Sequence, residues 1–242
     1  MFEKIKPEIV CFGGEDWWYH NRGHIDFQLM KRFAAVGKVL YINSIVMQKL
    51  NIFEGKGFLH KVARKSKSIL NGLQRTDAGF YVFSPLSIPL HHIETAGKLN
   101  DFFVGLQTSL ICENLKMDKP SVWVACPAAA NIAINMNKRK LIYQRTDKFE
   151  EFPNTDSSVI RKYDSKLKKH ADITFFVSEK LFKEEAGECR KAMLIDHGVD
   201  FERFTSAEKT ELIPDDIRNL PKPIVGFFGS IDSHTFDVDL VE

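Results

Sequence analysis

The amino-acid sequence predicts an α/β fold, in which a parallel β-sheet is covered by helices on both faces. Short apolar runs alternate along the chain with longer segments whose apolar residues recur every three or four positions, as they do on one side of an α-helix. The short runs are apolar at consecutive positions, which is typical of strands buried on both faces. With 242 residues, 44% hydrophobic and 27% charged, the chain has the composition of a globular protein with a sizeable core.

The first elements follow this alternation closely. The run EIVCFGG at 8–14 predicts a buried strand that ends in glycines. The segment 24–37 has helical spacing and ends at Gly37, a residue type that commonly terminates helices. KVLYIN at 38–43 predicts the second strand, and GFYVFSP at 79–85 predicts a third that ends in a proline.

A long helix and two further strands are predicted in the middle of the chain. The helix covers 95–116, and the strands SVWVAC and KLIYQR cover 121–126 and 140–145, with a short helical stretch from Pro127 between them. Most apolar side chains of the long helix share one face, namely Leu99, Phe102, Phe103, Leu106, Leu110 and Leu115.

The last elements of this pattern are a helix at 157–171 and strands at 172–178 and 192–196. Repeated strand–helix alternation builds a Rossmann-like parallel sheet, in which ligands bind at the carboxyl ends of the strands. We therefore expect the functional residues in the loops that follow the strands.

The composition changes after the last predicted strand. We predict a first domain at 1–204, a linker at 205–222 that is polar and rich in proline, and the start of a second domain at 223–242. The run PIVGFFGSID at 223–232 again has the character of a buried strand. Because a lone strand cannot bury itself, we expect it to open a second α/β domain of which the chain holds only the beginning.

The segment HGVDFERF at 197–204 contains a glycine suited to a tight turn directly after the last predicted strand. It resembles the Asn-Gly-Val-Asp-x-x-x-Phe signature with which GT-B glycosyltransferases of the large family 4-like group close the last strand of their acceptor-side domain. Four other segments resemble parts of these enzymes in the same order, at 18–43, 141–152, 163–181 and 222–232.

The resemblance implies that the chain is the N-terminal part of an enzyme that transfers a sugar from a nucleotide-sugar donor to a carbohydrate or lipid-linked acceptor, in bacterial surface polysaccharide biosynthesis. It implies no metal and no cofactor besides the donor substrate. In the family most donor contacts lie on the second domain, so here they would lie beyond Glu242, and we expect the isolated chain to be inactive. The chain departs from the pattern at His197, usually Asn, and at Asp164, where Glu is common. Two alternatives stay open: a non-catalytic module that binds acceptor or membrane, and a nucleotide-sugar epimerase.

The loop after the first strand holds most of the candidate binding residues. Gly13 and Gly14 would let backbone N–H groups approach a diphosphate at a helix N-terminus, or would form an ordinary turn between strand and helix. Indole rings stack on sugars and guanidinium groups pair with phosphate, although the aromatic side chains could instead fold back onto the core. The other candidates of this loop are Asp16, Trp17 and Arg22 for substrate binding and His24 for catalysis.

Asp147, just past the fifth strand, is the second catalytic candidate. A carboxylate at a strand's carboxyl end can bind acceptor hydroxyls or act as a general base, or it can cap the following turn. Arg145 is a candidate for substrate binding, with a salt bridge to Glu150 or Glu151 as its structural alternative. The resemblance adds donor-side candidates at Gly229, Ser230 and Asp232.

Charge and cysteine content limit the partners. A net charge of +2 gives no overall attraction to nucleic acid, and the absence of a G-x-G-x-x-G motif disfavours a dinucleotide oxidoreductase. The four cysteines form no C-x-x-C pair, so we expect buried free thiols in a reducing cytoplasm. No signal peptide or membrane span is predicted. The basic, amphipathic segment 56–70 predicts either peripheral contact with an anionic membrane or a helix packed on its own sheet.

Overall fold

A computed structural model of the chain describes residues 6–19, 23–45, 56–87, 94–152, 155–208, 213–224, 226–227, 237 and 239–240; the side chains of 56–62, 94–95, 203 and 207–208 lie outside this description. The chain divides into two compact units, Met1–Gly198 and Val199–Glu242. The β-sheet belongs to the first unit.

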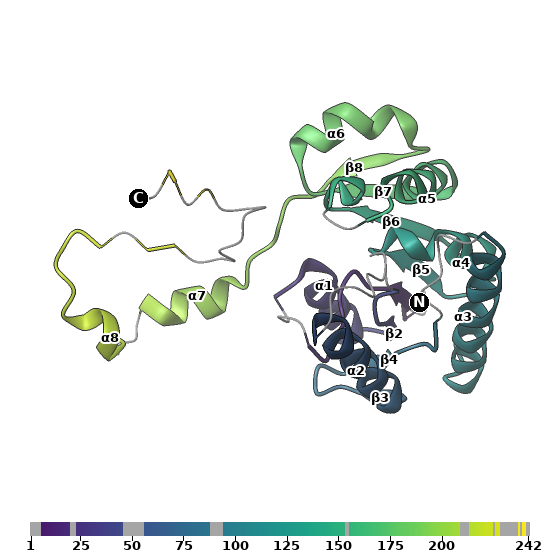
Figure 1. Ribbon diagram of the computed structural model, residues 1–242, viewed down its shortest axis with the longest axis horizontal. Helices are drawn as coiled ribbons and strands as arrows, with labels where there is room; N and C mark the ends of the chain where they lie inside the picture. Colours follow the sequence, from purple (N-terminus) through teal and green to yellow (C-terminus); the bar gives the residue numbers. More distant parts are fainter. Residues whose placement is uncertain are drawn as a thin grey trace, which may run out of the picture. The chain divides into compact units, whose positions relative to one another are not determined.

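Within the described residues, eight strands form one sheet in the order β3-β4-β2-β1-β5-β6-β7-β8 (Figure 1). Every neighbouring pair is parallel except β3 and β4, so the predicted α/β, Rossmann-like parallel sheet is confirmed. Seven strands match the predicted runs, whereas β3 is a three-residue edge strand too short to leave a hydrophobic pattern. The strands are β1 Glu8–Phe12, β2 Lys38–Ile42, β3 Leu73–Arg75, β4 Tyr81–Phe83, β5 Ser121–Val124, β6 Leu141–Arg145, β7 Ile173–Phe176 and β8 Ala192–Leu194.

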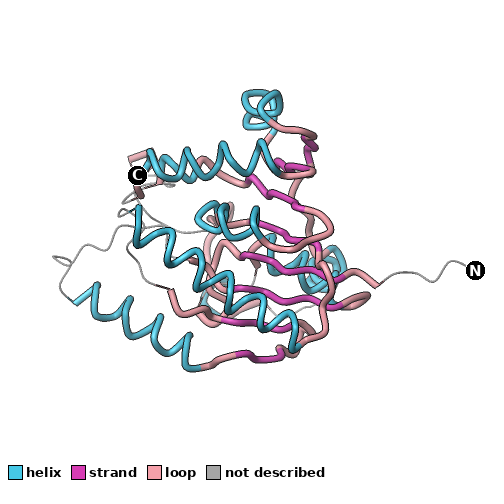
Figure 2. Tube along the Cα trace, turned by 90° about the vertical axis from the view of Figure 1, so that its right-hand side faces the viewer, coloured by secondary structure: helices cyan, strands magenta, loops and turns pink. Residues whose placement is uncertain are grey.

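Helices cover both faces of the sheet, with α1 and α2 on one side and α3 and α4 on the other (Figures 1 and 2). The predicted helices are confirmed, and the sequence pattern missed α6, a seven-residue helix whose N-cap is Ser178. The helices of the first unit are α1 Ile25–Ala34, α2 Lys56–Leu70, α3 Glu94–Asn114, α4 Ala130–Asn135, α5 Ser157–His170 and α6 Glu179–Glu185, with short 3-10 turns η2 Pro127–Ala129, η3 Phe149–Glu151 and η4 Ala186–Glu188.

The core has one layer on each side of the sheet. In β1, Val10 and Phe12 join the layer that contains α3, α4 and α5, while Ile9 and Cys11 join the layer that contains α1. Successive side chains of a strand point to opposite faces, so a strand covered on both sides must be apolar at every position. This explains why the strands were visible in the sequence as unbroken apolar runs.

Helix α3 does not bury the face that its apolar pattern marks. The buried residues among those whose side chains are described are Gly97, Asn100, Val104, Thr108 and Cys112, and the Thr108 hydroxyl donates to the Val104 carbonyl at 2.8 Å. The helix thus packs on the sheet through small side chains, which allow a close approach. The larger apolar side chains Leu99, Phe102, Phe103, Leu106 and Leu110 are exposed instead.

The second unit contains two helices in its described part, α7 Phe201–Glu208 and α8 Asp215–Arg218, both inside the stretch where we expected the end of a domain and a linker. The strand expected at 223–232 lies largely outside the described residues. Pro223, Ile224, Gly226 and Phe227, which are described, are not in a strand. The domain boundaries inferred from the sequence stay predictions.

Candidate functional site at the carboxyl edge of the sheet

The sheet reverses its strand order between β1 and β5. From β1 the chain adds β2 and β4 on one side, and from β5 it adds β6, β7 and β8 on the other. Open parallel sheets bind ligands at the carboxyl ends of the strands beside such a switch point. The described residues that follow β1, β2, β4 and β5 therefore form the candidate site, which we call the edge site.

Gly13 and Gly14 form a tight turn around a buried tyrosine. The Tyr41 hydroxyl donates to Asp26 Oδ2 at 2.7 Å and lies 3.0 Å from the Glu15 carbonyl. A Cβ at Gly13 would stand 1.8 Å from the Tyr41 oxygen, so only glycine fits there. The Gly13 amide donates to the Ile42 carbonyl at 2.9 Å, and the Gly14 amide donates to Asp26 Oδ2 at 2.9 Å. Both amides thus serve the fold here, and their contact with a diphosphate stays a prediction.

Asp16 belongs to a buried polar cluster that ties the first loop to two strand ends and to α2. Ser68 Oγ donates to Asp16 Oδ2 at 2.8 Å and lies 2.6 Å from Ser84 Oγ. Asn43 Nδ2 donates to Ser84 Oγ at 2.7 Å, and Asn43 Oδ1 accepts from the Trp17 amide at 2.9 Å. Buried polar groups that satisfy one another in this way fix the course of a loop. The Asp16 carboxylate, which also accepts from the Trp18 amide at 3.0 Å, therefore holds the loop after β1 in place, and its contact with a substrate stays a prediction.

Trp17 is a core residue. Its side chain is 5% exposed and packs edge-on against Phe27 and Phe80, with ring centroids 5.1 and 4.8 Å away. The buried indole ring is therefore not available to stack on a sugar. Trp17 instead folds back onto the core, which was the alternative given for the aromatic side chains of this loop. Arg64 of α2 lies over the ring of Tyr19 at 4.7 Å and holds the outer part of the same loop.

Lys65 is the residue of the edge site that the sequence analysis missed. Its ammonium donates to the Ser44 carbonyl at 3.0 Å, just past the end of β2. Burial lowers the pKa of Lys65, an effect that the nearby Asp16 opposes. In the sequence this lysine was one of several on the basic segment 56–70, and nothing in that pattern distinguished it. The fold turns its ammonium toward the carboxyl edge, where it supplies a positive charge.

Two further candidates are exposed side chains, and four others lie outside the described residues. His24 is exposed at the N-terminus of α1, with its ring 6.0 Å from that of Phe27. Asp147 is exposed just after β6 at the carboxyl edge. The remaining candidates, Arg22, Gly229, Ser230 and Asp232, lie outside the described residues.

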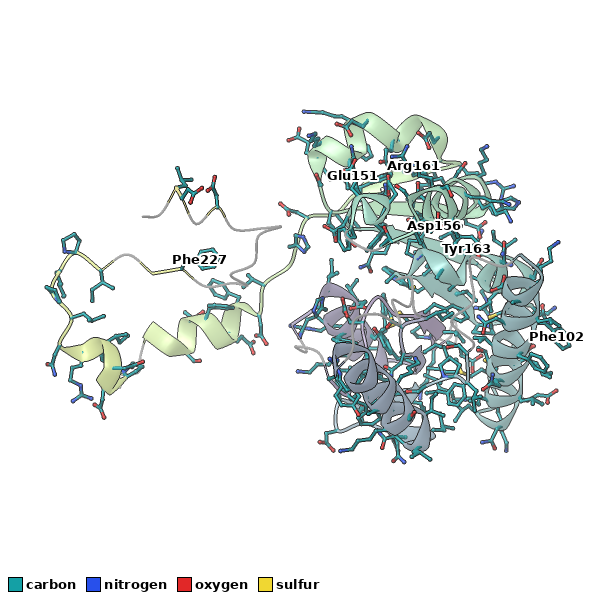
Figure 3. All side chains as sticks on the ribbon, viewed as in Figure 1. Phe102, Glu151, Asp156, Arg161, Tyr163 and Phe227 are labelled. Carbon is teal, nitrogen blue, oxygen red and sulfur yellow. The ribbon has the colours of Figure 1, made fainter. Side chains whose placement is uncertain are left out.

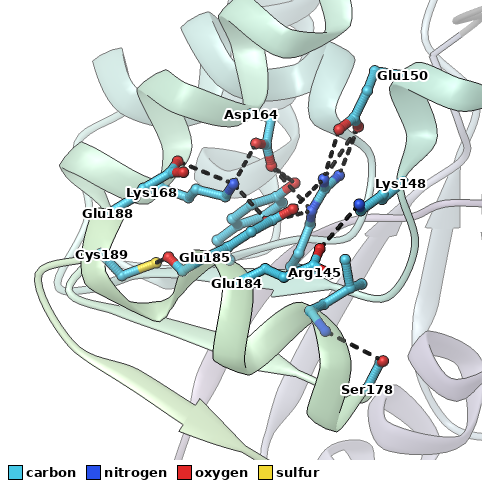
Figure 4. A network of polar contacts seen from close by, with 12 residues as sticks. Arg145, Lys148, Glu150, Asp164, Lys168, Ser178, Glu184, Glu185, Glu188 and Cys189 are labelled. Atoms are coloured by element: carbon cyan, nitrogen blue, oxygen red, sulfur yellow. Dashed lines mark hydrogen bonds and ion pairs between the residues drawn. The ribbon is translucent and has the colours of Figure 1, made fainter.

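Arg145 is fully buried at the end of β6 and belongs to an ion-pair network (Figure 4). It donates to both carboxylate oxygens of Glu150 at 3.0–3.1 Å, and to both oxygens of Glu185 at 3.1 Å. Asp164 Oδ1 lies 3.4 Å from its Nε. The salt bridge to Glu150, which the sequence analysis gave as the structural alternative, is thus present, and contact of Arg145 with a substrate stays a prediction.

Lys168 of α5 completes the network. Its ammonium lies 2.7 Å from Asp164 Oδ2 and 2.6 Å from Glu185 Oε2. Burial alone would lower the pKa of Lys168, but its bonds to these carboxylates outweigh burial and raise it. Burial alone would likewise raise the pKa of Glu150 and Glu185, but their bonds to Arg145 hold both below the ordinary value of 4.5. These pKa shifts keep Lys168, Glu150 and Glu185 charged near neutral pH, and the network joins β6 to α5 and α6.

A cavity of about 360 Å³ lies at the opposite edge of the sheet, around the beginnings of β6 and β7. It is lined by Ile134, Met136, Asn137, Lys138, Arg139, Leu141, His170, Asp172 and Arg190. The Asp172 carboxylate in this lining accepts from the Leu141 amide at 2.8 Å. The cavity is thus separate from the edge site.

Three further properties concern the described part of the chain. The cysteines are free thiols, with Cys11, Cys112 and Cys126 buried and Cys189 half-buried, and burial raises the pKa of Cys126 to about 11. No group of three or more His, Cys, Asp or Glu side chains is arranged to hold a metal ion within the ranges that the structure describes. Among the described helices, none combines the length and apolar character needed to span a bilayer.

No protein-family model matches the chain, and no curated protein matches its sequence. Among solved structures, a sucrose-phosphate synthase from Thermosynechococcus elongatus is similar in fold, with 9% sequence identity and a TM-score of 0.47. The match covers 84% of this chain and 95% of that one. At this TM-score the likeness carries no conclusion about function, and the α/β class rests on the strand order and pairing of the sheet itself.

Proposed function

We propose that the chain is the acceptor-side domain of a GT-B glycosyltransferase, which transfers a sugar from a nucleotide-sugar donor to a carbohydrate or lipid-linked acceptor. The observation that carries this proposal is the position of the HGVDFERF segment. It begins three residues after β8, the last strand of a parallel sheet with a switch point between β1 and β5. In the GT-B enzymes that it resembles, this signature leads from the acceptor-side sheet toward the donor domain.

The edge site supplies the chemistry that such a domain needs. Lys65 offers a positive charge that can pair with a phosphate group of the donor or of a lipid-linked acceptor. Asp147 is an exposed carboxylate at the same edge, and it can bind acceptor hydroxyls or take a proton from one. Asp16 and Trp17 hold the loop that follows β1 in place. A lipid-linked acceptor would be presented at a cytoplasmic membrane surface, for which the basic helix α2 is the proposed contact.

Lys65 gives the most direct test of the edge site. We expect Lys65→Met to weaken binding of nucleotide-sugars or soluble lipid-phosphate analogues by roughly 10–100-fold, because a charge-assisted phosphate contact contributes about 1.5–3 kcal/mol. Lys67→Met is the matched control, since Lys67 is exposed on the same helix. Titration calorimetry of both variants measures the difference. Equal affinities in the two variants would remove Lys65 from the site.

Activity is tested by mass detection of glycosylated product with a panel of nucleotide-sugars and acceptors, using this chain and a version extended past Glu242. Product that requires both donor and acceptor supports the transferase. Conversion of the nucleotide-sugar without acceptor identifies an epimerase. Binding without any conversion by the extended version identifies a non-catalytic module.

A further inference from the structure

Helix α3 carries an exposed apolar seam, formed by Leu99, Phe103, Leu106 and Leu110 with Phe102 beside it. These side chains are between 45% and 62% exposed. Figure 3 shows Phe102 on the outer side of α3, pointing away from the sheet. No described residue covers the seam, and its apolar side chains are therefore left in contact with water.

The fold does not need these side chains. Helix α3 is anchored by its opposite face, where Val104 and Thr108 are fully buried. It is also anchored by Gln107, whose side-chain amide bonds both the amide and the carbonyl of Leu86 at 2.9 and 3.0 Å. Large exposed apolar patches on a folded domain commonly mark a contact surface.

The spacing of the seam indicates a helix as its partner. The four residues are separated by 4, 3 and 4 positions, which is the alternation of a coiled-coil a/d seam. The alternation reads the same in both chain directions. An antiparallel copy of α3 therefore places Leu99 opposite Leu110 and Phe103 opposite Leu106.

We infer that the α3 seam is a homodimer interface, in which α3 packs antiparallel against α3 of a second copy of this chain. At the observed exposures the five side chains present on the order of 500 Å² of apolar surface, as much as the largest patch on a typical monomer. Two facing copies would remove roughly 1,000 Å² from water, which is the size at which specific interfaces begin. A two-fold axis makes such a contact self-complementary and closed.

A lipid surface fits the seam less well. Helices that lie on membranes carry lysine and arginine on their polar face. From Leu99 to Leu115, helix α3 and its end contain no lysine or arginine, and they contain the acidic residues Asp101 and Glu113. The charge along this helix thus disfavours anionic lipid.

The association state tests the inference. Sedimentation velocity of the chain should show a monomer–dimer equilibrium at micromolar concentrations, and Leu106→Glu should weaken dimerisation at least about 100-fold, because each dimer would bury two unpaired charges. Val36→Glu is the control, since Val36 is 60% exposed just after α1, outside the seam. Circular dichroism tests whether each variant is folded. If Leu106→Glu does not fold, the milder variant Leu99→Gln is used in its place.

A crosslinking experiment tests the direction of the helices. Leu99→Cys and Leu110→Cys variants in a Cys189→Ser background, mixed and mildly oxidised, should form the mixed disulfide dimer in preference to either self-dimer. A chain that sediments as a monomer throughout, or a dimer unaffected by both seam variants, overturns the inference. Preferential self-crosslinking overturns the antiparallel arrangement. Binding to neutral vesicles that Leu106→Glu abolishes, without any dimer, assigns the seam to lipid instead.

Discussion

Replacing Arg145 with methionine should strongly lower the stability of the first unit, even when no ligand is present. The guanidinium is fully buried and makes paired hydrogen bonds to Glu150 and Glu185. The variant removes the cation that pairs with the largely buried carboxylates of Glu150, Asp164 and Glu185. Asp164 and Glu185 keep their ion pairs with Lys168. Removing one partner of a buried ion pair costs about 3–5 kcal/mol, because the other charges stay buried without compensation.

The effect is measured by urea and thermal unfolding followed by circular dichroism. For a domain of this size each kcal/mol lowers the melting temperature by about 2–4 °C, so Arg145→Met should melt roughly 6–20 °C below the parent. Lys148→Met is the control, because its 3.0 Å pair with Glu184 is at the surface and should contribute little. If the two variants melt at the same temperature, the network does not stabilise the fold. If Arg145→Met is stable but loses ligand binding, Arg145 is a substrate residue after all.

Two further predictions follow from the described contacts. Gly13→Ala should destabilise the first unit by about 2–4 kcal/mol in urea unfolding, because the new methyl group displaces the Tyr41 hydroxyl from a fully packed site. Gly14→Ala is the control, because a Cβ there meets no atom closer than 3.8 Å, and this variant should stay within about 1 kcal/mol of the parent. Equal destabilisation by the two substitutions would refute the role given to Tyr41. The lowered pKa values of Glu150 and Glu185 mean that their contribution to the free energy of unfolding is present above the ordinary pKa of 4.5 and is lost as pH falls below it. Urea unfolding over a pH series should therefore show a shallower loss on acidification in Glu185→Gln than in the parent, and parallel curves would contradict the sign of that shift.

The layered fold and most of its strands could be predicted because burial on both faces makes a strand apolar at every position, and this pattern is local in the sequence. The position of the edge site followed from the same topology, since parallel strands bring all their carboxyl ends to one side. The salt bridge between Arg145 and Glu150 could also be anticipated from the sequence, because the two residues are only five positions apart.

The tertiary structure decided which side chains of the edge site are available. Trp17 looked like a sugar platform and is a core residue, because Phe27 and Phe80 enclose it. Lys65 of α2 looked like one charge of a basic surface, but its ammonium bonds the Ser44 carbonyl just past the end of β2. Helix α3 shows the same limit, since its apolar stripe was visible and its exposure was not. A hydrophobic pattern indicates that one face of a helix is apolar. Whether that face is buried within the protein or left exposed for a partner depends on how segments distant in the sequence pack against it.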